Sequence, residues 1–344
     1  MRMKKGILPF FLVMVLCSAC GSAQPSSSEM VEHSCFAMNT YITMQASGAD
    51  AARVLNETES LILELEGIFS VTEEGSELYA LNHSNGQPQT VSSETEELLS
   101  FALEIAEETE GSLDPTIYPL LTAWGFTTEN RQVPEQEEIQ SLLEQVDYTR
   151  IRMVDDTVTV PSGMALDLGA VAKGYTGDQA AAYIKEQGIT SALINLGGNV
   201  QAVGTKPDGS PWRIGLRDPF SEGNVGTLTV ENCAVVTSGG YQNYFMGEDG
   251  QVYWHILDPD TGYPARTGLA SVTVVAPEGV KCDALSTALF VMGLDGALDY
   301  WRAHGDFELI LITEDREIYL TPGLEDTFTL SDNAEGFVLE VAAP

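Results

Sequence analysis

Two neighbouring segments, Ser271-Val272-Thr273-Val274-Val275-Ala276 and Cys282-Asp283-Ala284-Leu285-Ser286-Thr287-Ala288-Leu289-Phe290, carry the pattern that most directs the fold. The first is a run of β-branched residues, which is typical of a buried strand. The second predicts a helix over 282–292, where Asp283 and Thr287 share one face, one turn apart. The neighbouring residues are apolar, so we expect both polar side chains to face inward, where they need partners.

A carboxylate and a hydroxyl facing inward together suggest a site for a hard cation, because hard cations prefer oxygen ligands. On spacing alone the same two residues also fit a structural role. The Asp would then cap its helix, and the Thr would bond back to its own helix.

Helices and strands are interspersed along the rest of the chain. Ser93 and Glu96 form a capping box for one helix, and Gly111 ends it. The predicted helices cover 50–69, 93–110, 134–146, 174–187, 282–292 and 295–303. The predicted strands cover 36–46, 191–196, 211–217, 226–231, 233–237, 252–256, 271–276, 307–313 and 316–320, with a hairpin over 151–160. Meandering strands with helices between them favour an α+β fold, in which helices cover antiparallel sheets.

The N-terminus has the pattern of a secretory signal peptide over 1–19, because a basic start precedes a short apolar run and small residues. The residues before Cys20 resemble a bacterial lipobox, although Cys17 stands where Leu is usual. This predicts lipidation at Cys20 and a flexible tether over 20–32. Ordinary secretion with an incidental cysteine is the alternative. We expect the main domain to cover 33–335 and a tail to cover 336–344.

The chain is strongly acidic, with a formal charge of −35 that becomes about −38 once the basic start is removed. Such a charge excludes nucleic acid and an anionic membrane surface as partners, because both need basic patches. The other cysteines, Cys35, Cys233 and Cys282, fit no zinc motif and are expected to be buried thiols, with one disulfide left open.

His255 is the histidine best placed for chemistry, since it ends a predicted strand just before the turn Asp258-Pro259. A near-neutral imidazole can accept a proton from a hydroxyl nucleophile. A structural histidine that bonds the turn is equally compatible with this position. Ser238 lies in no nucleophile-elbow pattern, so a serine hydrolase is not expected.

The run Asp167-Leu168-Gly169-Ala170-Val171-Ala172-Lys173-Gly174-Tyr175 leads a glycine-flanked loop into a helix. Backbone amides at a helix start can face an anion, and Lys173 adds a cation in an acidic chain. In isolation, a capping Asp and a surface Lys explain the run better.

Taken in order, several blocks resemble the ApbE-type flavin transferases, which are magnesium-dependent enzymes that move FMN from FAD onto protein threonine. The resemblance spans roughly 35–320 and implies a two-lobed, T-fold-like α+β architecture. The blocks are Ser112 to Thr116 with Trp124-Gly125-Phe126, Asp167 to Tyr175 with Asp178, Asn195 to Asn199, Thr237 to Gly239, His255 to Pro264, and Asp283 to Thr287.

The resemblance also implies roles for single residues. Ala170 (through its carbonyl), Asp283 and Thr287 would bind Mg²⁺, and His255, or second Asp283, would act as the base. FAD, the donor substrate, would contact Met38, Thr72, Ser112, Leu113, Asp114, Asp167, Lys173 and Leu257. Asn39 replaces the Gly usual after Met38, and Thr72 replaces a usual aromatic ring, for which Tyr41, Tyr118 and Tyr241 are candidate substitutes.

The expected function is therefore Mg²⁺-dependent transfer of FMN from FAD to a threonine of an acceptor flavoprotein of the electron-transfer type, releasing AMP. We expect the enzyme to be lipid-anchored at the cell membrane on its extracytoplasmic side. Two alternatives use the same residues. One is an FAD pyrophosphatase that yields FMN and AMP, and the other is a non-catalytic FAD-binding lipoprotein.

Overall fold

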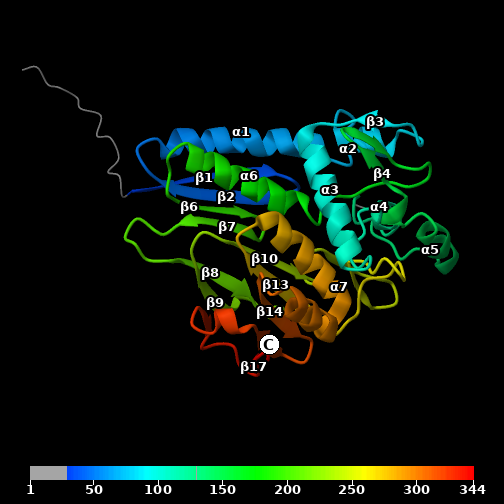
Figure 1. The fold of residues 1–344 in the computed structure, drawn as a ribbon. Coiled ribbons are helices and arrows are strands. Elements are labelled where there is room, and N and C mark those ends of the chain that lie inside the picture. The colour runs from blue at the N-terminus through cyan, green and yellow to red at the C-terminus, as the bar shows by residue number, and fades with distance from the viewer. Residues whose placement is uncertain (1–28, 129) are drawn as a thin grey trace, which may run out of the picture.

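The computed structural model describes residues 29–128 and 130–344, which include one large sheet and three small ones (Figure 1). The large sheet runs in the order β1 (Met30–Ala37), β2 (Thr40–Ser47), β6 (Ser191–Leu196), β7 (Asn199–Gly204), β10 (Ala234–Gly239), β13 (Leu269–Ala276), β14 (Glu308–Thr313), β15 (Glu317–Leu320) and β17 (Val338–Val341). Neighbouring strands in it are antiparallel except β15 and β17, which are parallel. The predicted α+β class is confirmed.

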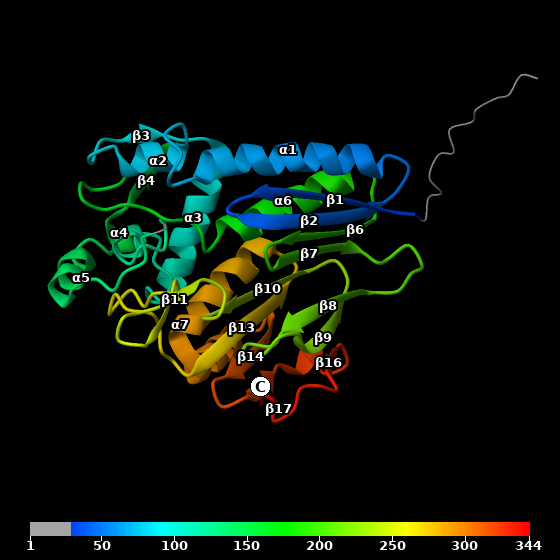
Figure 2. The same cartoon turned by 180° about the vertical axis from the view of Figure 1, so that it is seen from behind.

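Three long helices cover one face of this sheet: α1 (Ala51–Phe69), α6 (Ala172–Glu186) and α7 (Gly279–His304) (Figure 1). Helices α1 and α6 pack on β2 and β6, while α7 packs on β10, β13 and β14. The other face is partly covered by a small sheet of β16 (Phe328–Leu330), β9 (Asn224–Val230) and β8 (Trp212–Arg217) (Figure 2). Strand β13 is thus buried on both faces, because Val274 packs towards α7 and Val275 towards the small sheet. This explains its β-branched run.

A second group of elements lies beside the helices of the large sheet (Figure 1). It contains α2 (Glu77–Asn82), α3 (Ser93–Glu108), α4 (Tyr118–Ala123), α5 (Gln136–Leu143) and the small sheet of β3 (Gln89–Thr90), β5 (Thr157–Thr159) and β4 (Arg152–Val154). The hairpin of β11 (Tyr244–Met246) and β12 (Val252–Trp254) and the 3₁₀ turns Tyr148–Arg150 and Pro322–Leu324 complete the elements. The hairpin predicted over 151–160 is confirmed.

The strand predicted over 36–46 is wrong, because two strands meet there in a hairpin. Met38 and Asn39 form the two-residue turn, with φ of 51° and 57°. Two residues with positive φ are typical of the turn that matches the twist of a hairpin, and Asn tolerates that conformation well. Asn39, which stands in place of the usual Gly, therefore supports the turn.

Two helix predictions also need correction. The cap of α3 is Ser92 rather than Ser93, since Ser92 Oγ accepts from Thr95 N at 3.3 Å. The carboxylate that completes this cap comes from Glu77, which accepts from Ser92 N at 3.0 Å, and not from Glu96. The helices predicted over 282–292 and 295–303 form one element, α7, interrupted at Gly293, where φ is 77° and ψ is −178°.

Two segments expected to lie outside the main domain take part in the large sheet. Strand β1 begins at Met30, within the expected tether, and β17 lies within the expected tail of 336–344. Pairing with β2 and β15 satisfies the backbone groups of both segments, which a sequence pattern cannot reveal. The signal peptide, Cys20 and most of the tether lie outside the described residues. Across 29–128 and 130–344, no helix is long and apolar enough to cross a membrane.

Candidate functional site

The candidate site is built where the N-terminus of α6 meets the first turns of α7. Asp283 is buried, and its Oδ2 accepts a 2.8 Å hydrogen bond from Gly174 N. Asp178 of α6 holds the start of α7 by accepting from Gly279 N at 2.7 Å and Val280 N at 2.9 Å. Asp178 therefore caps α7 from another helix, which fixes the position of Asp283 relative to α6.

The hydrogen bond between Gly174 and Asp283 changes the backbone around Ala170. In a regular helix, Gly174 N would donate to the carbonyl of Ala170, four residues earlier. Because Gly174 N donates to Asp283 instead, the Ala170 carbonyl accepts no hydrogen bond from the described residues. The structure thus brings a free backbone carbonyl and a buried carboxylate to the same helix junction.

Thr287 lies on α7 one turn after Asp283, and its hydroxyl is loosely held. Its Oγ1 lies 3.4 Å from the backbone oxygen of Asp283 and 3.3 Å from Ser238 Oγ on β10. Ser286 makes the shorter contacts, at 2.8 Å to Ser238 Oγ and 3.0 Å to the Asp283 carbonyl. The Thr287 oxygen is therefore available to a ligand at little cost in lost hydrogen bonds.

These three groups fit a magnesium ion by their chemistry. Magnesium takes oxygen ligands and typically keeps water and substrate phosphates in its remaining positions. Oδ1 of Asp283 accepts no hydrogen bond from the described residues, and the Ala170 carbonyl is equally free. No group of three or more His, Cys, Asp or Glu side chains that could hold a metal occurs within 29–128 and 130–344.

The loop before α6 is held by its own polar groups. Asp167 Oδ1 accepts from Gly169 N at 2.7 Å, and Lys173 Nζ donates to Gly169 O at 3.1 Å. Asp167 N donates to Pro115 O at 2.8 Å, which ties this loop to the turn at 112–116. Burial raises the pKa of Asp167, while the Gly169 hydrogen bond and the charge of Lys173 lower it. Asp167 and Lys173 are thus neighbours, as their predicted common ligand requires.

In the turn at 112–116, the Asp114 carboxylate is fully engaged by the protein. Oδ1 accepts from Thr116 N at 2.7 Å and Thr116 Oγ1 at 2.6 Å, and Oδ2 accepts from Tyr148 N at 3.1 Å. Burial raises the pKa of Asp114 despite these hydrogen bonds. Leu113 is buried in the main core beside Ser112, which is half-buried. Asp114 therefore shapes the turn, and its contact with a nucleotide stays a prediction.

His255 follows β12 directly rather than ending it, and its backbone N donates to Asn243 O at 3.1 Å. Its ring nitrogen Nδ1 is buried and has no hydrogen-bond partner among the described residues. Burial, helped by the positive charges of Lys173 and Arg131, lowers the pKa of His255 to about 4. The imidazole is therefore neutral at pH 7 and can accept a proton or a hydrogen bond from a ligand.

Arg131 joins this site, although its sequence context gives no sign of it. Its Nη2 donates to Asn243 Oδ1 at 2.8 Å, and its guanidinium lies 4.9 Å from the ring centroid of Phe126. Nη1 is buried without a partner among the described residues. A buried cationic donor without a partner is costly, so this group is suited to bind an anion.

The remaining predicted contacts are placed differently. Met38 N donates to Glu66 Oε1 at 2.6 Å, so the hairpin turn lies against α1. Thr72 is exposed in the loop after α1, and its described hydrogen bonds go only to Ser70. Leu257 is buried in an apolar cluster, and its backbone pairs with Pro264 in an isolated β-bridge. No contact among the described residues links Thr72 to Asp283.

Of the three tyrosines considered as substitutes for a ring at Thr72, Tyr118 interacts electrostatically with a predicted nucleotide residue, Asp167. Burial raises the pKa of Tyr118, and the charge of Asp167 contributes to the rise. Tyr41 is exposed on β2, and Tyr241 lines a cleft on the other face of the large sheet. The sequence alone could not choose among them.

The fold and the site define an α+β protein with a helix-covered antiparallel sheet and a cluster of free oxygen ligands between two helices. The model of the ApbE family matches residues 38–311. The FAD:protein FMN transferase of Treponema pallidum is 32% identical over 96% of each chain, and that of Klebsiella pneumoniae is 32% identical over 86% of this chain and 93% of its own. The chain belongs to the ApbE family, as predicted.

Two solved structures agree with this assignment. The ApbE protein of Thermotoga maritima is 32% identical, with a TM-score of 0.78 over 88% of this chain and 97% of its own. The flavin transferase ApbE from Vibrio cholerae is 28% identical, with a TM-score of 0.76 over 90% of this chain and 99% of its own. The similarity therefore extends over nearly the whole described fold.

Proposed function

We propose that this chain transfers FMN from FAD to a threonine hydroxyl of an acceptor protein. Transfer of FMN from FAD to protein is the activity that its relatives' names state. The structural observation that carries the proposal is the helix junction, where Gly174 leaves the Ala170 carbonyl free beside the Asp283 carboxylate. That arrangement suits a cation bound to a diphosphate, and the proposed transfer breaks the diphosphate linkage of FAD.

In the proposed reaction, the acceptor hydroxyl attacks the FMN phosphorus of FAD. A new P–O bond forms to the threonine oxygen while the P–O bond to AMP breaks, so AMP leaves with the bridging oxygen. The hydroxyl proton passes to a base. The flavin is neither oxidised nor reduced, and the acceptor gains the mass of FMN less one water.

A magnesium ion at Ala170, Asp283 and Thr287 would neutralise charge that develops on the phosphoryl oxygens and on the departing phosphate. Lys173 and Arg131 place two further positive charges around His255, since both lower its pKa. In a chain with 51 acidic and 16 basic residues, such concentrated positive charge favours a polyanionic substrate. Asp167, held by Gly169 N, then orients rather than neutralises the nucleotide.

His255 is the first candidate to accept the hydroxyl proton. It is neutral at pH 7, and its Nδ1 has no partner among the described residues. Asp283 is the second candidate, but its Oδ2 is already bonded to Gly174 N, and metal binding would weaken it as a base. Bound phosphates would raise the pKa of His255 from its value in the free protein, which improves it as a base.

The experiment that tests this function is mass spectrometry of candidate acceptors incubated with the protein, FAD and Mg²⁺. The expected product is an acceptor that carries FMN on one threonine, with one AMP released for each modification. If no acceptor gains this mass while free FMN accumulates, the protein is an FAD pyrophosphatase. If FAD is recovered intact, it is a non-catalytic FAD-binding protein.

We further propose that the enzyme is lipid-anchored through Cys20 on the extracytoplasmic side of the membrane, where its acceptor would be an electron-transfer flavoprotein. The support is the signal-like start of the chain and the lipobox resemblance around Cys20. Replacing Cys20 with Ser should move the protein from the membrane fraction to the soluble extracytoplasmic fraction. An unchanged distribution would contradict the anchor.

A further inference from the structure

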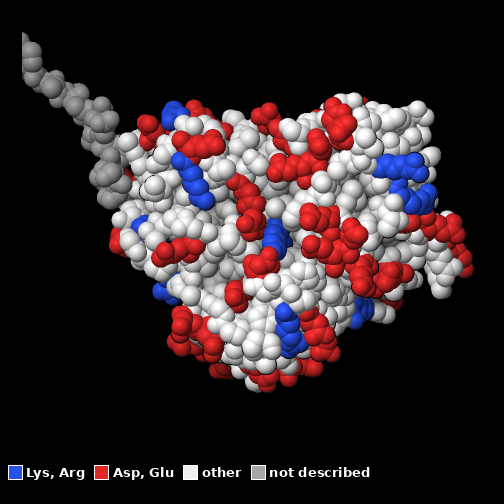
Figure 3. Space-filling view, in the orientation of Figure 1, with Lys and Arg blue, Asp and Glu red and all other residues white. Residues whose placement is uncertain are grey.

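A polar cleft of about 520 Å³ lies on the face of the large sheet opposite the helices, beside strand β8. Its chemistry is unusual for this protein. The chain has 51 Asp and Glu residues, yet the cleft lining contains none of them and includes two arginines, Arg213 and Arg217. The face seen in Figure 3 shows how the basic side chains elsewhere are scattered among acidic ones.

Both arginines lie on the exposed face of β8. Along this strand, Trp212, Ile214 and Leu216 are buried in the core between the sheets, whereas Arg213 and Arg217 alternate with them and are exposed. Both arginines are among the residues that line the cleft. Neither the guanidinium of Arg213 nor that of Arg217 forms an ion pair or side-chain hydrogen bond with residues 29–128 or 130–344. Arg217 instead lies 5.3 Å from the ring centroid of Tyr241.

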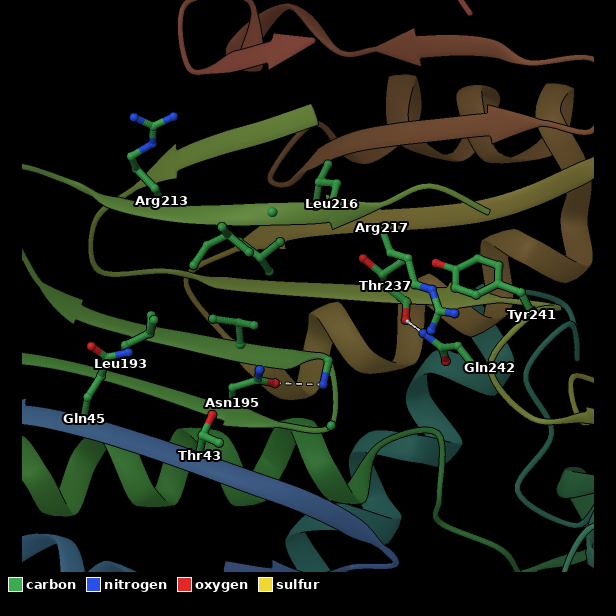
Figure 4. A pocket seen from close by; sticks show the side chains of 16 residues that line it. Thr43, Gln45, Leu193, Asn195, Arg213, Leu216, Arg217, Thr237, Tyr241 and Gln242 are labelled. Atoms are coloured by element: carbon green, nitrogen blue, oxygen red, sulfur yellow. Dashed lines mark hydrogen bonds between the residues drawn. The ribbon is translucent and has the colours of Figure 1, made fainter. Parts of the chain in front are cut away.

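The cleft also has an open strand edge. Strand β8 ends its three-stranded sheet, so one side of its backbone pairs with β9 and the other pairs with no strand of the described chain. A free edge is a template for an added strand, and this kind of recognition is specific to polypeptide. Figure 4 shows Arg217, Thr237, Tyr241 and Gln242 gathered at one end of the cleft, with Arg213 towards the other.

The cleft and the candidate active site lie on opposite faces of strand β10. Thr237 and Ser238 are neighbours on β10, so their side chains point to opposite faces of the sheet. Ser238 contacts Thr287 at the candidate cation site, whereas Thr237 lines the cleft. A polypeptide segment that leaves the cleft near Tyr241, just beyond the end of β10, is therefore close to the reacting centre.

We propose that this cleft docks an extended, acidic segment of the acceptor protein, an inference that rests on the proposed transferase function. The segment adds a strand to the free edge of β8 and sets carboxylates against Arg213 and Arg217. The arginines are four residues apart on a strand, or about 13 Å, so the matching carboxylates are also spaced about four residues apart. Docking there delivers the target threonine around the end of β10.

The test is a double charge reversal, Arg213→Glu with Arg217→Glu, assayed with the acceptor that the wild-type enzyme modifies. The acceptor KM should rise about tenfold or more while kcat stays within about twofold, because the contacts act in docking and not in chemistry. FAD affinity, measured by flavin fluorescence, should not change. The wild-type KM should also rise with ionic strength, and the variant KM should depend on it less.

The matched control is Arg152→Glu with Lys185→Glu. Both residues are exposed, lie on β4 and α6 away from the cleft lining, and change the net charge by the same amount. The control should keep the wild-type acceptor KM. An acceptor in which two acidic residues near the target threonine are replaced by Lys should recover part of its affinity for the reversed enzyme.

Several outcomes would overturn the proposal. An unchanged acceptor KM in the double reversal would do so, as would an equal rise in the control, which would show a general charge effect. AMP or inorganic phosphate that binds the wild type but not the double reversal would identify a phosphate site instead. Failure of the wild type to modify any acceptor would refute the transferase function itself, so the two failures are distinguishable.

Discussion

The backbone N–H of Gly174 donates to Oδ2 of Asp283, and this hydrogen bond helps to join the two helices that carry the candidate cation site. It satisfies a buried carboxylate oxygen and withdraws the donor that would otherwise occupy the Ala170 carbonyl. One contact thereby positions one predicted ligand and frees another. Asp283 thus has a structural role in addition to its predicted role as a cation ligand.

Asp283→Asn should separate the structural role of Asp283 from its predicted role as a cation ligand. The amide oxygen can still accept from Gly174 N, so stability should change by less than about 1 kcal/mol. The loss of charge should weaken Mg²⁺ binding and lower flavin transfer by about 100-fold or more. Calorimetric Mg²⁺ titration in the presence of FAD, with thermal unfolding, measures both effects.

Asp283→Ala is the companion variant. It leaves Gly174 N buried without its acceptor, so unfolding free energy should fall by about 1–3 kcal/mol in addition to the loss of activity. Full transfer activity in either variant would refute the metal assignment. Equal stability loss in both would show that the Asn side chain fails to replace the hydrogen bond.

Gly174 should not tolerate a methyl group. A Cβ there would lie 2.2 Å from Gly279 O and 2.7 Å from Asp283 Cβ, so Gly174→Ala should force α6 and α7 apart. We expect a loss of about 2–3 kcal/mol in unfolding free energy, together with weaker Mg²⁺ binding. Denaturant unfolding checks the first effect.

Gly177→Ala is the matched control on the same helix. Its Cβ would make only ordinary contact, 3.6 Å from Leu196 Cδ1. Because Ala costs less backbone entropy than Gly in a helix, this variant should be neutral or more stable by about 0.5–1 kcal/mol. Similar destabilisation by both substitutions would contradict the importance of the α6–α7 contact.

The pH dependence of activity should report His255. Its pKa is lowered from 6.5 to about 4 in the free protein, so kcat/KM should be flat from pH 7 downwards and fall only as pH approaches 4. His255→Gln should lower kcat by about 100-fold or more and lose this titration. A variant with wild-type kcat and an unchanged acidic limb would exclude His255 as the base.

The same shift makes a prediction for stability. Below pH 6.5 the unfolded chain protonates this histidine while the folded chain does not, so His255 lowers the stability progressively from pH 6.5 to about 4. His255→Gln should therefore lose less stability than the wild type over that interval. Thermal unfolding of both proteins at several pH values measures the difference.

Lys173→Met should raise the pKa of His255. Burial is the main cause of the low pKa, and the positive charge of Lys173 is the next cause. Removing that charge favours the imidazolium, so the His255 titration should move from about 4 towards 6.5. NMR of labelled histidines, assigned against His255→Gln, follows it directly. An unmoved titration would show that the two groups are not coupled.

The sequence was sufficient where a local pattern coincides with its tertiary role. The β-branched run of β13 and the one-turn spacing of Asp283 and Thr287 predicted a buried strand and a shared helix face. It failed where a partner comes from far along the chain. Ser92 looked no better than Ser93 as a cap, because the carboxylate that completes the motif belongs to Glu77 in another helix.

Contacts between distant segments also determined the parts of the site that the sequence could not predict. Arg131 becomes a site residue only because the fold places it against Asn243 and near His255. Arg213 and Arg217 share one face of β8 by local alternation, but only the fold places that strand at the edge of its sheet beside the cleft. Local periodicity does not encode where a strand lies in its sheet.

The amino-acid sequence by itself determined the fold class, the family and the cation-ligand candidates, because period, turn chemistry and ordered blocks are local properties of the chain. The tertiary structure decided that Gly174 binds Asp283 and so frees Ala170, that His255 is held neutral, and that an acid-free cleft lies behind the site. These features depend on burial and on distances between remote segments, which exist only after the sheet has assembled and the helices have packed on it.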